Sequence, residues 1–422
     1  MPKIIRKINY ILFIVFLSAC NRVIIEPYVS ENAIAIKGME MKDNEYADLH
    51  PIGDAIGDSR IVMLGEQDHG DAATFLAKTR LIKYLHEEKG FNVIAFESDF
   101  FALTQGWDKL TKQKDDINQF IRSNVFSIWS HCDACEHLLY EYIPNSLFTK
   151  KPMQLTGFDC QMMLGYSKQN LAKSIDSIIR QYQLPIIKTE IYQKLIKEDI
   201  STLLSQYQKR NESQPFHISM DNILSEIESQ LASKAGTGDY WLLIIQNLLQ
   251  YNREFIAKNH IDGNSVRDKQ MALNLLWLLN QKIKNEKVIV WAHNAHIINN
   301  ADRLSYSKNS FINMTTHLLN MIPSNEKVYV LGFTSGRGTT GRLGQKQYSI
   351  PFGETKSIDG ILFALKYPFA FLDFNAFNRK YPNYRKPFLM KGIHHMYGKE
   401  QWNKHYNGIF YIKEMYPCNP ID

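Results

Sequence analysis

The stretch RIVMLGEQDHGDAATF, residues 60–75, places an apolar run directly before a loop that holds titratable side chains. The run IVML has no interspersed polar residue, as expected of a strand that is covered on both faces of a parallel sheet. The loop then presents Glu66 and His69 three positions apart. We therefore expect a carboxylate and an imidazole at the carboxyl end of a buried strand.

The segment after this loop predicts a helix and then a second strand. Apolar side chains recur at helical spacing until Gly90, which is expected to end the helix. The run FNVIAFE, residues 91–97, completes a parallel strand–helix–strand unit. Similar apolar runs return at residues 153–159, 287–293 and 327–333. The sequence thus predicts an α/β fold with a mostly parallel sheet flanked by helices.

Between two of these strands the pattern becomes entirely helical. Residues 166–285 contain long helical patterns, such as YWLLIIQNLLQYNREFIAKN, and no strand pattern. A further helix is predicted to begin at Ser265, with Asp268 three residues later as a capping box. We expect a helical insert that covers the carboxyl ends of the strands, within one composite domain of residues 46–422.

The N-terminus has the pattern of an export signal. Three basic residues precede an apolar stretch, residues 10–17, that is too short to span a bilayer as a mature helix. It ends in LSAC, residues 17–20, which resembles the lipobox of bacterial lipoproteins; the alternative is an ordinary signal peptide with a chance cysteine. We expect residues 1–19 to be a lipoprotein signal peptide, Cys20 to carry the lipid, and residues 20–45 to tether an exported protein to a membrane of the cell envelope.

Charge and cysteine content restrict the partners. The 49 basic and 43 acidic residues are spread along the chain without a basic block, so nucleic acid is not an expected partner. The segment HCDACEH, residues 131–137, looks like half of a zinc site, but no second ligand pair lies nearby in the sequence. Outside the cytosol, a local disulfide between Cys132 and Cys135, or two ordinary helix cysteines, is the better interpretation.

Titratable side chains follow the ends of four predicted strands. Ligands of open parallel sheets bind beyond the carboxyl ends of the strands, so these groups should converge on one rim. Each alone fits a capping, core or surface role, but a charged Glu97 at the end of a buried strand requires a partner. The six residues are Glu66, His69, Glu97, Asp159, His293 and His296.

Several segments together resemble the erythromycin esterase family. They are LGEQDHG with the helix after it, FNVIAFESD, GFD, RDKQMALNLLWLL and VIVWAHNAHI, in the family's order and with similar spacing. The resemblance covers residues 58–333 and extends to NGIFYI at residues 407–412. The loop pattern alone is weak, whereas its combination with WAHNAH is specific.

The resemblance implies an esterase in which a histidine activates water against a macrocyclic lactone, without a serine nucleophile, a required metal or another cofactor. The family's site then falls on Glu66, His69, Glu97, His293 and His296, with His69 as the base. A carboxylate such as Glu66 or Glu97 would fix the tautomer of the base. His293 or His296 would hold the carbonyl oxygen as negative charge develops.

The chain departs from the family pattern beside the base. The family commonly has an arginine nine residues after the loop histidine, where this chain has Lys78, and Arg80 is expected to face differently. We assign substrate binding to Lys78, Asp159 and Arg267, and expect an ester or a macrolide-like small molecule. The loop also has Gln67 and Asp68 where small residues are frequent in the family, and both departures bear on the substrate more than on the site.

Two other functions fit the same residues. The two carboxylates and three imidazoles could hold zinc or manganese for metal-dependent hydrolysis. Alternatively, a surface lipoprotein could bind an apolar ligand or an iron compound under the helical insert without turning it over. Serine chemistry is not expected, because no G-x-S-x-G motif occurs. The segment TSGRGTTGR, residues 334–342, is predicted to be a solvent loop, with contact to an anionic group or a sugar as the alternative. The histidine-rich residues 392–406 are predicted to be a surface segment.

Overall fold

The structure is a computed structural model that describes residues 24–421 except 41, 43, 207–213, 237, 306–310 and 353. The predicted signal peptide and Cys20 therefore lie outside the described residues. Within the described part, no helix is long and apolar enough to cross a membrane.

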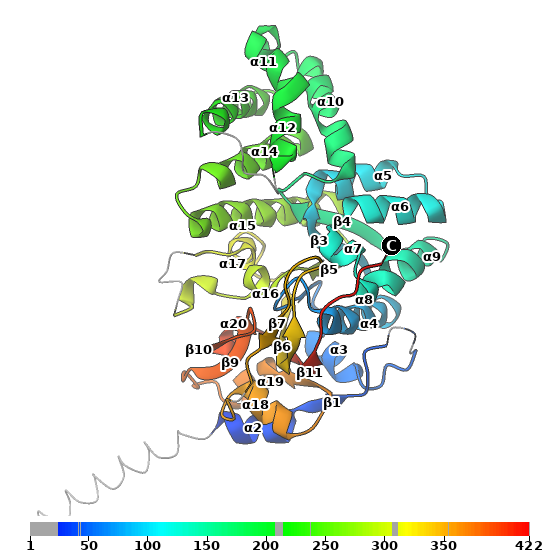
Figure 1. The fold of residues 1–422 in the computed structure, drawn as a ribbon, viewed down its shortest axis with the longest axis vertical. Coiled ribbons are helices and arrows are strands. Elements are labelled where there is room, and N and C mark those ends of the chain that lie inside the picture. The colour runs from blue at the N-terminus through cyan, green and yellow to red at the C-terminus, as the bar shows by residue number, and fades with distance from the viewer. Residues whose placement is uncertain are drawn as a thin grey trace, which may run out of the picture.

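A mostly parallel sheet forms the centre of the fold (Figure 1). The five predicted strands are confirmed, and they lie side by side in parallel, in the order β4, β3, β5, β2, β6. Their bounds are β2 Ile61–Leu64, β3 Phe91–Asp99, β4 Gln154–Asp159, β5 Lys287–Trp291 and β6 Val328–Thr340. Four strands that the sequence analysis did not predict complete the sheet: β11, β8 and β1 extend it beyond β6 in that order, and β7 pairs with β6. They are β1 Ile34–Ile36, β7 Tyr348–Ile350, β8 Phe369–Asp373 and β11 Gly408–Met415.

The N-terminal segment joins the fold earlier than predicted. Helix α2 (Ile25–Asn32) buries Val29, and β1 pairs antiparallel with β8. Pairing of β1 with β8 holds much of residues 20–45 on the domain. The predicted tether of residues 20–45 was therefore too long.

Both faces of the sheet are buried, which explains the unbroken apolar runs. Along β2, Ile61 and Met63 pack into one hydrophobic core, whereas Val62 and Leu64 pack into the other. The second core is covered by α4 (Ala72–Lys89), which ends at Gly90 with φ of +74°, as predicted. Shorter helices cover the same face: α3 His50–Ile56, α6 Lys114–Asn124, α7 Ser127–Ser130, α8 Asp133–Glu136 and α9 Ile143–Ser146.

The helical insert is confirmed between β4 and β5. In Figure 1 its helices lie at one end of the molecule, next to β3 and β4. Its main helices are α10 Gly165–Gln181, α12 Ile200–Leu204, α13 Gln214–Ala232, α14 Tyr240–Ile256 and α15 His260–Trp277. The predicted start at Ser265 was wrong: α15 begins five residues earlier, because the side chain of Asn259 accepts a hydrogen bond from the backbone N–H of Asp262 and caps the helix.

Two other sequence interpretations were wrong. Residues 334–340 are not a loop but the second half of β6, which pairs with β11 and β7. The segment 392–406 is not a simple surface segment, since it contains the hairpin of β9 (Phe388–Ile393) and β10 (Met396–Glu400) and then α20 (Trp402–His405). Its His395 and His405 are buried.

For Cys132, both sequence interpretations, a local disulfide with Cys135 or an ordinary helix cysteine, were wrong. Cys132 is bonded to Cys418, 286 residues away, whereas Cys135 is free and buried in α8. Cys132 lies in extended conformation just before α8, and the C-terminal segment runs past it, where Pro420 forms a β-bridge with Cys132. The disulfide therefore holds the C-terminus against the loop that precedes α8.

We expect Cys132→Ala to lower the free energy of unfolding by about 2–5 kcal/mol, because the cross-link restricts a long loop of the unfolded chain. Chemical denaturation of the oxidised protein and of the variant measures this difference. Cys135→Ala is the matched control and should have a smaller effect that a reductant does not change. Equal stability of wild type and Cys132→Ala under oxidising conditions would contradict the structural role.

Candidate active site

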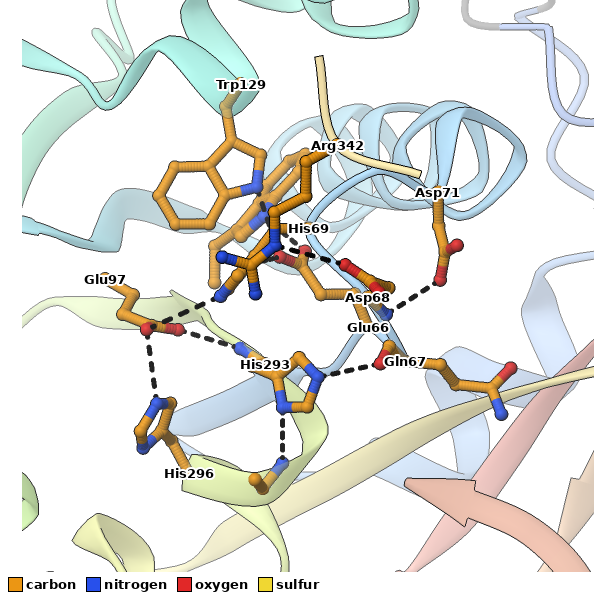
Figure 2. A network of polar contacts seen from close by, with 12 residues as sticks. Glu66, Gln67, Asp68, His69, Asp71, Glu97, Trp129, His293, His296 and Arg342 are labelled. Carbon is orange, nitrogen blue, oxygen red and sulfur yellow. Dashed lines mark hydrogen bonds and ion pairs between the residues drawn. The ribbon is translucent and has the colours of Figure 1, made fainter. Parts of the chain in front are cut away.

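Two loops that are more than 200 residues apart in the sequence meet at the carboxyl ends of β2 and β5. The backbone N–H of Asn294 donates to the carbonyl oxygen of Glu66 (2.8 Å), and Nε2 of His293 donates to that of Gln67 (2.7 Å). A Cβ atom at Gly65 would collide with the amide side chain of Asn294, so only glycine permits this approach. The loops thus position the first and the last of the predicted site residues together, as Figure 2 shows.

Glu66 is fully buried and accepts hydrogen bonds from four side chains. Its Oε1 accepts from Nδ1 of His69 (2.8 Å) and Nε1 of Trp129 (3.2 Å), and its Oε2 accepts from Nζ of Lys78 (2.7 Å) and Nε1 of Trp291 (2.8 Å). Burial acts to raise its pKa, but the charges and hydrogen bonds of Lys78 and His69 outweigh burial, so the pKa of Glu66 lies below its ordinary value. Glu66 is therefore a carboxylate.

His69 is oriented by this carboxylate. The bond from Nδ1–H to Glu66 leaves Nε2 as the unprotonated nitrogen of the neutral ring. Nε2 lies 4.0 Å from Oε1 of Glu97, too far for a direct hydrogen bond. The ring of Trp129 meets the imidazole edge to face, with centroids 5.6 Å apart. The tautomer and orientation of His69 both suit proton acceptance from the side of the cavity.

Glu97 lies near the carboxyl end of β3 and is paired as the sequence analysis expected. Its Oε1 accepts from Arg267 of α15 (2.8 Å), and its Oε2 accepts from the backbone N–H of His293 (2.9 Å). Burial acts to raise its pKa, but His296, His69 and Arg267 hold the pKa well below the ordinary value. Arg267 also makes two hydrogen bonds to Asp159 at the end of β4, of 3.1 and 2.6 Å. One guanidinium thus joins the ends of two strands.

The two histidines of WAHNAH have different roles. Burial, and then the neighbouring His394, lower the pKa of His293 well below its ordinary value. Its Nδ1 accepts from the backbone of Ala295 (3.0 Å) while Nε2 donates to Gln67, so both nitrogens are engaged. His293 is a neutral ring that joins the two loops.

His296 is instead a cation. Its Nδ1 lies 2.8 Å from Asp268 and its Nε2 lies 3.2 Å from Glu97. Burial alone would lower its pKa, but the two carboxylates raise the pKa to about 10. Asp268, which the sequence analysis took for a helix cap, is fully buried and holds this cation.

A cavity with a volume of about 290 Å³ opens above these groups. Five predicted residues line it: His69, Glu97, Arg267, His293 and His296. Three others lie behind the cavity wall and are fully buried, namely Glu66, Lys78 and Asp159. Lys78 therefore contacts Glu66, with its ammonium over the ring of Trp291 at 4.1 Å, and burial lowers its pKa to about 8. Arg80 faces away, as expected, and pairs with Asp48.

The cavity also contains residues that the sequence analysis did not assign. Trp129, Arg342 and His394 are among them. Arg342 lies two residues after β6, and its Nε lies 3.4 Å from Oδ1 of Asp68. The other oxygen of Asp68, Oδ2, accepts from the hydroxyl of Tyr348 (2.5 Å). The position of Arg342 at the end of a sheet strand is the signal that could have identified it.

His394 reaches the cavity from a strained turn. It forms, with His395, the two-residue connection between β9 and β10, and their φ angles of +53° and +52° match the left-handed conformation of a type I′ turn. His395 is buried and lies 2.8 Å from Oγ of Ser335 and 3.0 Å from Asp71. This serine, histidine and aspartate are all 0% exposed, so they fix the turn and are not accessible to a substrate.

The arrangement does not fit a metal ion. In the described part of the chain, three ligand atoms approach within 4.8 Å of one another only at Cys132, Asp133 and Cys418, where the two cysteines form the disulfide. At the cavity, Glu97 is already compensated by the guanidinium of Arg267 and the imidazolium of His296.

The fold and site together define an α/β protein with a histidine–carboxylate centre at the rim of its sheet. The erythromycin esterase family model matches residues 86–415, a range that includes Glu97, Arg267 and both WAHNAH histidines. The chain therefore belongs to the erythromycin esterase family of hydrolases.

Individual relatives are distant. The chain is 25% identical over 275 residues to YbfO of Bacillus subtilis strain 168, a match that covers 59% of each protein. It is 26% identical over 297 residues to erythromycin esterase type II of Escherichia coli, covering 64% of this chain and 68% of that one.

Solved structures share the whole fold. A succinoglycan biosynthesis protein superposes with a TM-score of 0.71 at 18% identity, over 93% of this chain and 97% of that one. A mutant of the erythromycin esterase EreC in its open conformation gives a TM-score of 0.66 at 16% identity, over 91% and 98%.

The raised pKa of His296 makes a prediction about pH and stability. The pKa in the folded state, about 10, exceeds the ordinary value of 6.5, so the stabilisation by His296 is complete below pH 6.5 and is lost as pH rises toward 10. We expect the free energy of unfolding of wild type to exceed that of His296→Asn by on the order of a few kcal/mol at pH 6.5. Denaturant unfolding across this pH range should show the difference shrinking. Lys78 titrates in both proteins, so its contribution cancels in the difference between their unfolding free energies. A difference that grows with pH would contradict the raised pKa of His296.

Proposed function

We propose that the protein hydrolyses an ester or lactone with His69 as the general base. The observation that carries this proposal is the bond from Nδ1 of His69 to the buried Glu66, which directs the other nitrogen to the cavity. Membership of the erythromycin esterase family supports the reaction class.

In the proposed reaction, a water molecule near Nε2 of His69 and Oε1 of Glu97 attacks the ester carbonyl carbon. The water gives one proton to Nε2, and the carboxylate of Glu66 stabilises the imidazolium that forms. When the tetrahedral intermediate collapses, its carbon–oxygen bond breaks and the leaving alkoxide takes that proton from His69. The products are a carboxylic acid and an alcohol.

The developing oxyanion needs a cation or an N–H donor at the cavity. Both ring nitrogens of His293 and of His296 already contact other groups. They are therefore less suitable for stabilising the oxyanion than a side chain with additional N–H donors. Arg342 is 38% exposed and contacts Asp68 through Nε, so its terminal nitrogens can face a substrate. We assign the oxyanion to Arg342, and to His296 the role of holding Glu97 in place.

We expect the full chain to hydrolyse erythromycin or at least one simple ester by the addition of one water. His69→Ala should lower kcat by about 10²–10⁴-fold, and Arg342→Gln should lower it by about 10²–10³-fold. Mass spectrometry of erythromycin and a panel of simple esters measures the gain of one water, and the release of acid gives the rates.

Matched controls lie elsewhere in the same fold. His50 is an exposed histidine of α3, and Arg337 is an exposed arginine of β6 that pairs with Glu414. His50→Ala and Arg337→Gln should keep the wild-type rate. Full activity in His69→Ala would rule out the proposed base, and an unchanged kcat in Arg342→Gln would remove only the oxyanion assignment.

We further propose that the chain is exported and anchored through Cys20. The lipobox-like LSAC motif and the Cys132–Cys418 disulfide support an oxidising compartment. We expect wild type to fractionate with membranes and Cys20→Ser to be released from them. Wild type recovered free of membranes would contradict the anchor.

A further inference from the structure

A second cavity opens beside the catalytic one. Its volume is about 400 Å³, and both cavities are lined by Asn264, Ala295, Phe311 and His394. Because they share these four lining residues, the two cavities adjoin. We call the second space the apolar cavity.

Hydrocarbon side chains dominate its lining. Ile298, Leu304 and Trp402 line it and are at most 3% exposed. At the rim, Ile261 of α15 and Met396 of β10 are 52% and 63% exposed. Large apolar side chains that stay in contact with water beside a cavity are typical of a binding surface for an apolar ligand.

The hairpin fixes one wall of the apolar cavity relative to the catalytic loop. Ile393 and Met396 flank the turn residues His394 and His395. His395 bonds to Asp71, whose carboxylate also accepts from the backbone N–H of Asp68, next to His69. The wall and the base therefore belong to one connected, buried network, and a ligand that spans both cavities meets a preorganised site.

The two cavities differ in chemistry. The catalytic cavity is lined by ionised groups such as Glu97, Arg267 and Arg342, which favour a polar ester group over hydrocarbon. We propose that the apolar cavity binds a hydrocarbon part, an aliphatic chain or saturated ring, of an ester whose carbonyl lies at His69. This inference rests on the proposed function and specifies its substrate class.

The test compares esters that differ in chain length. p-Nitrophenyl octanoate against the acetate varies the acyl side, and octyl acetate against ethyl acetate varies the alcohol side. The full chain should prefer the longer chain in at least one pair, by about tenfold or more in kcat/KM. Met396→Glu should remove about tenfold of this preference, because a carboxylate at the rim opposes the entry of hydrocarbon.

Two variants serve as controls. Met396→Leu should restore the preference, and Ile218→Glu, at an isoleucine on α13 that is 51% exposed, should leave it unchanged. A preference that is equal in wild type and Met396→Glu for both pairs would overturn the inference.

Calorimetric binding of octanamide separates this inference from the proposed function. We expect binding with a negative heat-capacity change in wild type and at least tenfold weaker binding in Met396→Glu. If no ester is hydrolysed but octanamide binds in this way, the proposed function fails and the apolar cavity stands. If esters are hydrolysed but octanamide does not bind, the apolar cavity is overturned.

Discussion

A carboxylate that is fully buried behind the catalytic cavity constrains the rest of the site. Glu66 can remain ionised there only because each of its oxygens accepts two hydrogen bonds and one donor is a cation. The donors come from different parts of the fold: Lys78 from α4, Trp129 from α7 and Trp291 from β5. Those elements must therefore pack in one arrangement, and that arrangement leaves His69 as the donor that faces the cavity. Removal of one partner of such a buried pair typically costs about 3–5 kcal/mol, so catalytic geometry and stability depend on the same contacts.

The same compensation of charge continues across the rim of the sheet. Glu97 lies between the cations of Arg267 and His296, and each cation is held in turn by another buried carboxylate, Asp159 or Asp268. This alternation explains how two histidines three residues apart reach different charge states, His293 neutral and His296 cationic. His296 faces carboxylates on both sides, whereas His293 faces backbone groups and other imidazole rings. The neighbouring charged and polar groups, and not the residue type, determine the protonation state of each imidazole ring.

The sequence was most informative where local patterns and sheet geometry agree. The apolar strands, the helix that ends at Gly90 and the clustering of Glu66, Glu97 and His293 could all be predicted, because strand ends in a parallel sheet share one edge. Asp268 was misinterpreted because its spacing from Ser265 matches a capping box equally well. Arg342 and His394 were missed since a glycine-rich segment and a histidine-rich segment give no periodic signal.

The sequence by itself determined the class of fold, the positions of five parallel strands along the chain and which side chains stand at their ends, because apolar periodicity and the direction of parallel strands are local properties of the chain. Only the tertiary structure decided that Lys78 lies behind Glu66 and not in the cavity, that Cys132 pairs with Cys418, and that Arg342 and the apolar cavity lie beside His69. These features depend on contacts between segments separated by up to hundreds of residues. No local pattern records which distant group will occupy the space beside a given side chain.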